Sequence, residues 1–214
     1  MKDLLNRIRK PTRVSISRKI LYSTLVLVFG IILGIVSKAL DETASNLLPS
    51  FLQMLDLRNF FSHMGIWIFL AVLISLYSKS PIRAAINVFL FFVGMVSSYY
   101  IYTIKIAGFF PKSYMMIWVT MTFISPIMAS ICWYAKGKGS VALFISSIIV
   151  TFISRQAFAF GLWYFDITNI LELILWIATI LVLYQSPKQI IKVVGIGVAL
   201  FFLTSQMDLF WGIL

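Results

Sequence analysis

The sequence predicts an all-α membrane protein, a polytopic bundle of about seven transmembrane helices, with six as the alternative count. Hydrophobic residues make up 61% of the 214 residues and charged residues only 12%. Soluble domains carry about 25% charged residues, and they have too few buried positions for this much apolar surface. Long apolar segments recur along the chain, and basic residues gather in the short turns between them.

The basic N-terminal segment, residues 1–19, is expected in the cytoplasm, ahead of a transmembrane domain that covers residues 20–214. It holds seven of the 18 Lys and Arg residues. Because they stand directly before a long apolar run, we attribute them to topology and to contact with anionic lipid, not to nucleic acid. Leu4, Leu5 and Ile8 among these charges predict a short amphipathic helix that ends before Pro11.

Seven helices follow from the apolar segments, since a span needs about 20 apolar residues. The expected helices cover residues 20–40, 59–77, 81–104, 113–134, 140–161, 169–184 and 187–207. The connection 41–58 contains a short apolar stretch that is expected at the membrane interface or folded back into the bundle. The sixth helix is short by about one turn, and without it the count falls to six and the C-terminus changes side.

Local signals support several of these helices. Ser80 and Pro81 match an N-cap followed by proline at the first helical position. Pro126 removes a backbone hydrogen bond and is expected to kink the fourth helix. Gly30 and Gly34 form a small-xxx-small pair that lets another helix approach closely. We expect this pair to serve general helix packing; a dedicated dimer face is the alternative.

The turns set the expected orientation. With the N-terminus inside, the inner turns hold Lys79, Arg83, Lys136, Lys138, Lys188 and Lys192. Every acidic residue except Asp3 then falls near the outer side, so the positive-inside rule places the N-terminus in the cytoplasm. By size and class the chain resembles the small multi-pass proteins of bacterial cytoplasmic membranes, which implies a multi-pass location in the cell membrane. The three inner turns resemble one another. This similarity indicates either an internal duplication of three helical hairpins or the general form of short cytoplasmic turns.

Ionisable residues within the hydrocarbon are costly and mark candidate functional sites. Arg155 is expected about 9 Å below the outer end of its helix, and Glu172 lies at a comparable depth in the next. We expect these two to form an ion pair or to face one water-filled outer cavity, with a purely structural pair as the alternative. The candidate ligand-binding residues are Arg155, Gln156, Glu172, Tyr99, Tyr100 and Asp166.

Polar and aromatic residues at this outer level suit a small organic solute, although tyrosines also form the belt at membrane interfaces. His63 is the single histidine and Cys132 the single cysteine. A multi-histidine metal site and an intrachain disulfide are therefore excluded, and the spacing does not support a mixed histidine and carboxylate metal site.

The chain is not expected to be an enzyme. It lacks the serine-hydrolase elbow, the zinc-binding helix motif and the phosphate-binding loop, so no catalytic residue, metal or cofactor is expected. The expected function is the binding or transport of a small solute through a polar cavity on the outer side. The alternative is a non-catalytic partner or regulatory subunit of a membrane complex. The expected partners are membrane lipids, an unidentified solute and, on the alternative, another membrane protein.

In a liposome assay, residues 1–19 are expected to bind anionic vesicles more tightly than neutral ones, because basic residues are attracted to anionic headgroups. Equal binding to the two lipids would contradict the proposed anionic-lipid contact.

Overall fold

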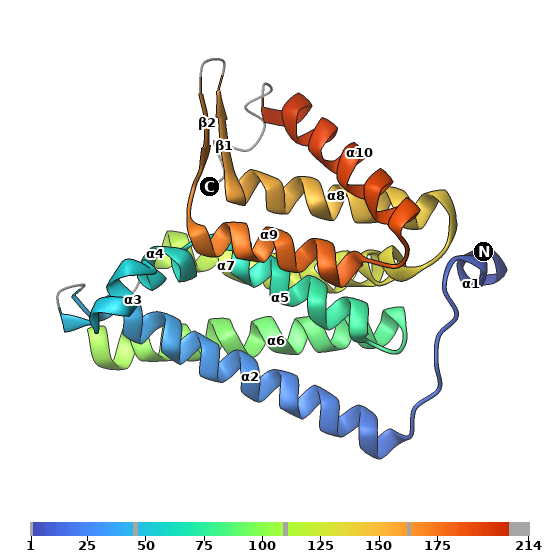
Figure 1. The fold of residues 1–214 in the computed structure, drawn as a ribbon. Helices are drawn as coiled ribbons and strands as arrows, with labels where there is room; N and C mark the ends of the chain where they lie inside the picture. Colours follow the sequence, from blue (N-terminus) through green and yellow to red (C-terminus); the bar gives the residue numbers. More distant parts are fainter. Residues whose placement is uncertain (1, 45–46, 109–110, 162–163, 206–214) are drawn as a thin grey trace. The chain divides into compact units, whose positions relative to one another are not determined.

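The computed structural model describes residues 2–44, 47–108, 111–161 and 164–205. Within these ranges the chain is helical apart from one short β-hairpin, which confirms the all-α class (Figure 1). Two compact units are formed, one by residues 1–9, 63–69 and 134–214 and the other by residues 10–62 and 70–133. The division falls inside one helix, α5 (Met64–Tyr77).

Five helices in the described part of the chain are long and apolar enough to cross a membrane. They are α2 (Ile16–Glu42), α6 (Pro81–Tyr102) with the π-helical turn η2 (Thr103–Ala107), α7 (Lys112–Cys132) with the 3-10 turn η3 (Trp133–Lys136), α8 (Gly139–Ala157) and α10 (Pro187–Ser205). Their large exposed apolar side chains, such as Ile16 and Ile20 of α2, are consistent with a membrane location.

Two further apolar helices, α5 and α9 (Ile170–Leu183), have 14 residues each. Such a helix is about 21 Å long, whereas the hydrocarbon core is about 30 Å thick. The predicted count of seven spans is therefore not confirmed by helix length. Three shorter helices complete the set: α1 (Lys2–Ile8), α3 (Ser50–Met54) and α4 (Leu57–Ser62).

In the second unit, α2 and α6 lie side by side and run parallel (Figure 1). Gly30 and Gly34 of α2 face the backbone of α6, and a Cβ on Gly30 would overlap the carbonyl oxygen of Phe91. Gly94 of α6 faces the backbone of α2 in the same way. The small-xxx-small pair thus brings together two helices of one chain.

Polar contacts fix the other end of this helix pair. Ser80 is the N-cap of α6 and accepts a hydrogen bond from the backbone N–H of Arg83 at 3.2 Å, as predicted. The Arg83 guanidinium donates to the carbonyl oxygen of Lys19 at 2.8 Å and to Oδ1 of Asn87 at 3.2 Å. Side chains at the start of α6 therefore hold the first turns of α2.

Helix α7 continues through Pro126. The proline leaves the carbonyl of Thr122 without its usual N–H donor, and the hydroxyl of Ser125 donates to that carbonyl at 2.8 Å. Near the end of α7, the indole of Trp133 donates to the carbonyl of Ser78 at 2.7 Å. These bonds keep backbone oxygens satisfied in an apolar surrounding.

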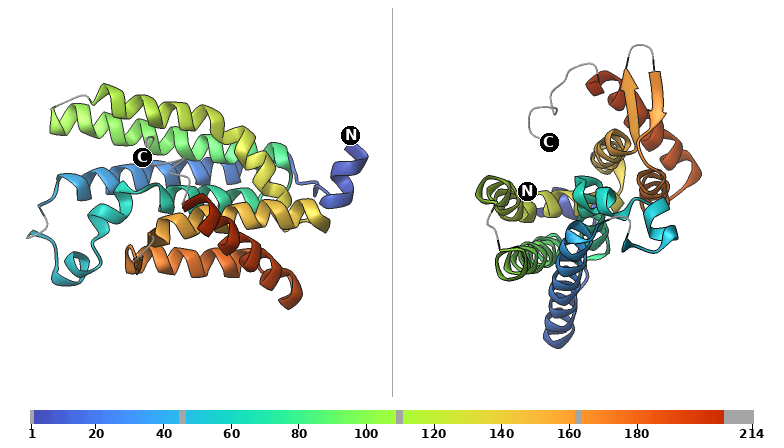
Figure 2. Two further views of the ribbon diagram at one scale, coloured as in Figure 1. Left: turned by 90° about the horizontal axis from the view of Figure 1, so that it is seen from above. Right: turned by 90° about the vertical axis from the view of Figure 1, so that its left-hand side faces the viewer.

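In the first unit, α8 packs against both α9 and α10. Thr151 of α8 donates to the carbonyl of Gly197 in α10 at 3.0 Å, and the indole of Trp176 in α9 donates to Ser154 at 2.8 Å. An antiparallel hairpin of β1 (Phe158–Gly161) and β2 (Tyr164–Ile167) extends from the end of α8 (Figures 1 and 2).

Two predicted helix boundaries are wrong. The fifth helix was expected to reach Gly161 but ends at Ala157, because the aromatic run that follows favours extended strands and Phe158 stacks on Phe165 across the hairpin. The second was expected to be continuous from residue 59 but is interrupted at His63. There the hydroxyl of Ser62 donates to the Asn59 carbonyl, the acceptor that the next helical N–H would use. Residues 206 and 207 of the seventh predicted helix lie outside the described residues.

Replacing Gly30 by Ala is expected to lower the free energy of unfolding by about 1–3 kcal/mol, because the added methyl meets rigid backbone of α6. Gly195→Ala is the matched control, since a Cβ there meets nothing within 4 Å, and its higher helix propensity adds up to about 1 kcal/mol. Both are measured by unfolding in a denaturing detergent. Equal effects of the two substitutions would contradict the close α2–α6 contact.

Candidate functional site: Glu172 and His63

Glu172 is a completely buried carboxyl group in an otherwise apolar helix. It occupies the third residue of α9, whose N-cap, Asn169, accepts a hydrogen bond from the backbone N–H of Leu171 at 2.7 Å. The first turn of a helix favours negative charge through the helix dipole. In this turn, Glu172 contacts residues at the start of α5.

Two residues at the start of α5 contact this carboxyl group. Nδ1 of His63 lies 3.6 Å from Oε1 of Glu172, an ion-pair distance when the imidazole is protonated and longer than a hydrogen bond. A Cβ on Gly65 would overlap Oε2 and lie 2.9 Å from Oε1. The carboxyl group therefore occupies space that exists because residue 65 has no side chain.

Neither oxygen of Glu172 has a hydrogen-bond partner among the residues that the structure describes. Leaving a buried polar group unsatisfied costs about 1–3 kcal/mol, and more when the group is charged. Native structures keep few such groups, and they call for a functional or structural explanation. His63 supplies a compensating charge only while it is protonated.

The site lies where two short helices begin. Both α5 and α9 start beside the carboxyl group, and both are shorter than a full span. Transporters commonly place binding sites at discontinuous helices, where the positive N-terminal ends of half-helices face anionic groups. The geometry here has these parts, with a carboxyl group between them.

The other predicted site residues of the first unit make contacts of their own. Arg155, in the last turn of α8, donates to the hydroxyl of Ser205 at 3.4 Å. No ion pair joins Arg155 to Glu172 within the described residues, so the expected pairing is not found. Gln156 is partly buried beside Arg155, and Asp166 is exposed in β2, where it accepts the N–H of Ile167 at 2.8 Å.

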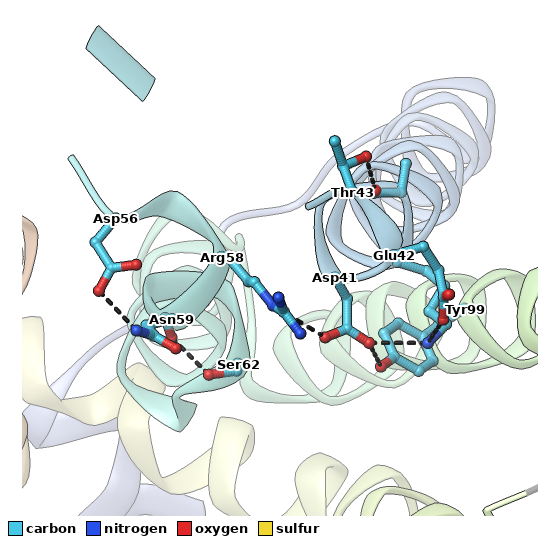
Figure 3. A network of polar contacts seen from close by, with 10 residues as sticks. Asp41, Glu42, Thr43, Asp56, Arg58, Asn59, Ser62 and Tyr99 are labelled. Atoms are coloured by element: carbon cyan, nitrogen blue, oxygen red, sulfur yellow. Dashed lines mark hydrogen bonds and ion pairs between the residues drawn. The ribbon is translucent and has the colours of Figure 1, made fainter. Parts of the chain in front are cut away.

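Tyr99 and Tyr100 belong to the second unit. The hydroxyl of Tyr99 lies 3.3 Å from Oδ2 of Asp41, to which it donates, within a polar network at the end of α2 (Figure 3). In this network the buried amine of Lys38 lies 2.8 Å from Asp41 and 2.5 Å from Glu42. Arg58 adds a longer contact of 3.8 Å to Asp41. Tyr99 is thus engaged by the protein itself, whereas the buried hydroxyl of Tyr100 has no hydrogen-bond partner among the described residues.

The sequence identified Glu172 as a candidate site residue and His63 as the single histidine, but no pattern brought the two together or marked Gly65. The available signal was the position of each residue near the start of an apolar segment, on the same side of the predicted membrane. Within the described residues, no group of three or more His, Cys, Asp or Glu side chains is placed to hold a metal ion.

No protein-family model matches the chain, and neither a curated protein nor a solved structure matches it. The fold defines a class, a helical protein whose described residues include five helices apolar enough for a membrane. Within that class, the function is argued from the buried carboxyl group and its neighbours.

Gly65→Ala is expected to lower the free energy of unfolding by about 1–3 kcal/mol, because the methyl displaces the carboxyl group of Glu172. In a Glu172→Ala background the same change should carry no such penalty. The higher helix propensity of alanine should then raise the free energy of unfolding by up to about 1 kcal/mol. A double-mutant cycle in detergent measures the difference. The same penalty in both backgrounds would show that the two side chains do not meet.

Proposed function

We propose that this chain is a multi-pass protein of the cytoplasmic membrane that binds or transports a small solute, with Glu172 as the group that binds a proton or a cationic solute. The observation that supports it is a fully buried carboxyl group without hydrogen-bond partners in the described part of the chain. A lone carboxylate is costly in an apolar environment. A proton or an ammonium group supplies the compensation that His63 does not give while it is neutral.

His63 gives this carboxyl group a route to solvent. The imidazole side chain is 45% exposed, whereas that of Glu172 is 0% exposed. Imidazole is the side chain best suited to exchange protons near neutral pH. On this proposal, His63 takes a proton from the aqueous side and passes it to Glu172, and the 3.6 Å separation shortens when the transfer occurs.

The proposal includes seven crossings with the N-terminus inside. Helices α5 and α9 cross although each is shorter than the hydrocarbon core, as a short helix does where the bilayer thins around it. The basic turns then face the cytoplasm, and the Glu172 site faces the outer side. Arg155, Gln156 and Asp166 of the first unit, with Tyr99 and Tyr100 of the second, remain candidates for contact with a solute from that side.

The test is thermal unfolding of the full chain in detergent, across alkali cations, primary amines and amino acids at several pH values. Three proteins are compared: wild type, Glu172→Gln, and the control Asp56→Asn, which changes an exposed carboxylate in the same way. Asparagine suits the positive φ of 47° at residue 56. A solute at 100 times its Kd adds about 2.7 kcal/mol to the stability of the wild type and the control. Glu172→Gln should lose this gain.

Two results would contradict the proposal. One is a solute that stabilises Glu172→Gln as strongly as the wild type. The other is a full panel without effect, combined with a large loss of stability in Glu172→Gln. The second result would make Glu172 a structural partner of His63 and would favour the alternative of a non-catalytic subunit.

A further inference from the structure

A basic cavity of about 460 Å³ lies in the first unit, where α8 and α10 begin. It is lined by the turns before these helices and by their first residues. Lys138, Lys188 and Lys192 contribute three positive charges, and none of the described residues that line the cavity is acidic. Like charges around one cavity repel each other, and a bound anion relieves this repulsion.

Two helix N-termini add to the positive potential of the cavity. Helix α8 begins at Gly139, and its N-cap residue, Lys138, makes no side-chain capping hydrogen bond. Its first-turn N–H groups are therefore not capped by that side chain. Helix α10 begins at Pro187 on the same cavity. Proline has no N–H, and the N–H of Gln189 donates to the hydroxyl of Ser186 at 3.3 Å, so α10 contributes mainly its dipole. Helix N-termini favour anions through these N–H groups and through the helix dipole.

The turns around the cavity are held in place by hydrogen bonds. The backbone N–H of Lys138 donates to the carbonyl of Ile8 in α1 at 2.8 Å. The carbonyl of Ala135 accepts from Ser146 at 3.0 Å and from the side chain of Gln185 at 3.2 Å. Gln185 thus ties the turn before α10 to the turn before α8. A preformed site loses less entropy when a ligand binds.

The amide side chain of Gln189, which lines the cavity, indicates a second feature of the ligand. Oε1 of Gln189 is buried and has no hydrogen-bond partner among the described residues. An amide oxygen accepts hydrogen bonds. This oxygen is covered in the present conformation, so we expect the partly buried side chain to turn toward the cavity when a ligand with a hydroxyl or primary ammonium donor binds. Ala142 and Leu143 add an apolar part to the lining.

We propose that this cavity binds a phosphate ester that also carries a hydroxyl or a primary ammonium group, which can donate a hydrogen bond. The three lysines and the helix N-termini contact the phosphate, and Gln189 accepts a hydrogen bond from the donor group. Two sources share this chemistry, the headgroup of a glycerophospholipid and a soluble ester such as glycerol phosphate. Basic pockets at helix ends near the cytoplasmic surface suit phospholipid headgroups. The site is independent of the function proposed for Glu172.

The test uses the full chain in neutral detergent, with binding followed by thermal stability. The ligands are phosphatidylglycerol, phosphatidylcholine, glycerol phosphate and inorganic phosphate. Lys188→Gln/Lys192→Gln is compared with the control pair Lys10→Gln/Lys79→Gln, which removes the same charge from exposed residues outside the cavity. Ser140→Trp keeps every charge and fills the cavity. Stability without ligand is measured first for each variant.

Phosphatidylglycerol or glycerol phosphate is expected to stabilise the wild type and the control pair. Affinity should fall about 25-fold in Lys188→Gln/Lys192→Gln, about fivefold for each lysine near a phosphate, and should also fall in Ser140→Trp. Stabilisation by the lipid alone identifies a headgroup, and stabilisation by glycerol phosphate identifies a soluble ester. The proposal is overturned if no phosphate ligand outperforms phosphatidylcholine, if the control pair loses as much affinity, or if Ser140→Trp retains full affinity.

Discussion

The fold depends on one constraint: polar groups in apolar helices must find their hydrogen bonds within the chain. Thr122, Thr151, Thr179 and Thr204 each donate to a carbonyl four residues earlier in the same helix. The hydroxyl beside Pro126 replaces the donor that proline removes. Hydrocarbon offers no water to such groups, so each one is satisfied internally. Helices then meet through glycines, carbonyls and apolar side chains.

A few buried polar atoms depart from this rule. Within the described residues, the buried side-chain atoms without hydrogen-bond partners belong to Tyr100, Glu172 and Gln189. Glu172 lies in the first turn of α9, beside the start of α5, and Gln189 lines the basic cavity. The two sites differ in charge and therefore in ligand. A carboxyl group suits protons and cations, whereas three lysines suit a phosphate.

Much of the architecture was readable from the sequence, because hydropathy and capping are local properties. The apolar segments, the N-cap at Ser80 and the packing role of Gly30 and Gly34 all followed from short patterns. The hairpin did not, since hydropathy alone does not distinguish an aromatic strand from the end of an apolar helix. The approach of His63 to Glu172 also escaped prediction. It depends on where a helix breaks and on the absence of a side chain at Gly65, which only packing reveals.

The short spacing between Lys38 and its two carboxylates has a consequence for the order of assembly. Asp41 and Glu42 lie three and four residues after Lys38 in the same helix. In a bilayer, α2 would carry this lysine already neutralised by its own segment, without waiting for a partner. Gly30 and Gly34 of α2, by contrast, can pack only after α6 has been synthesised. Insertion and packing of α2 are thereby separated in time, and each uses a different part of the same helix.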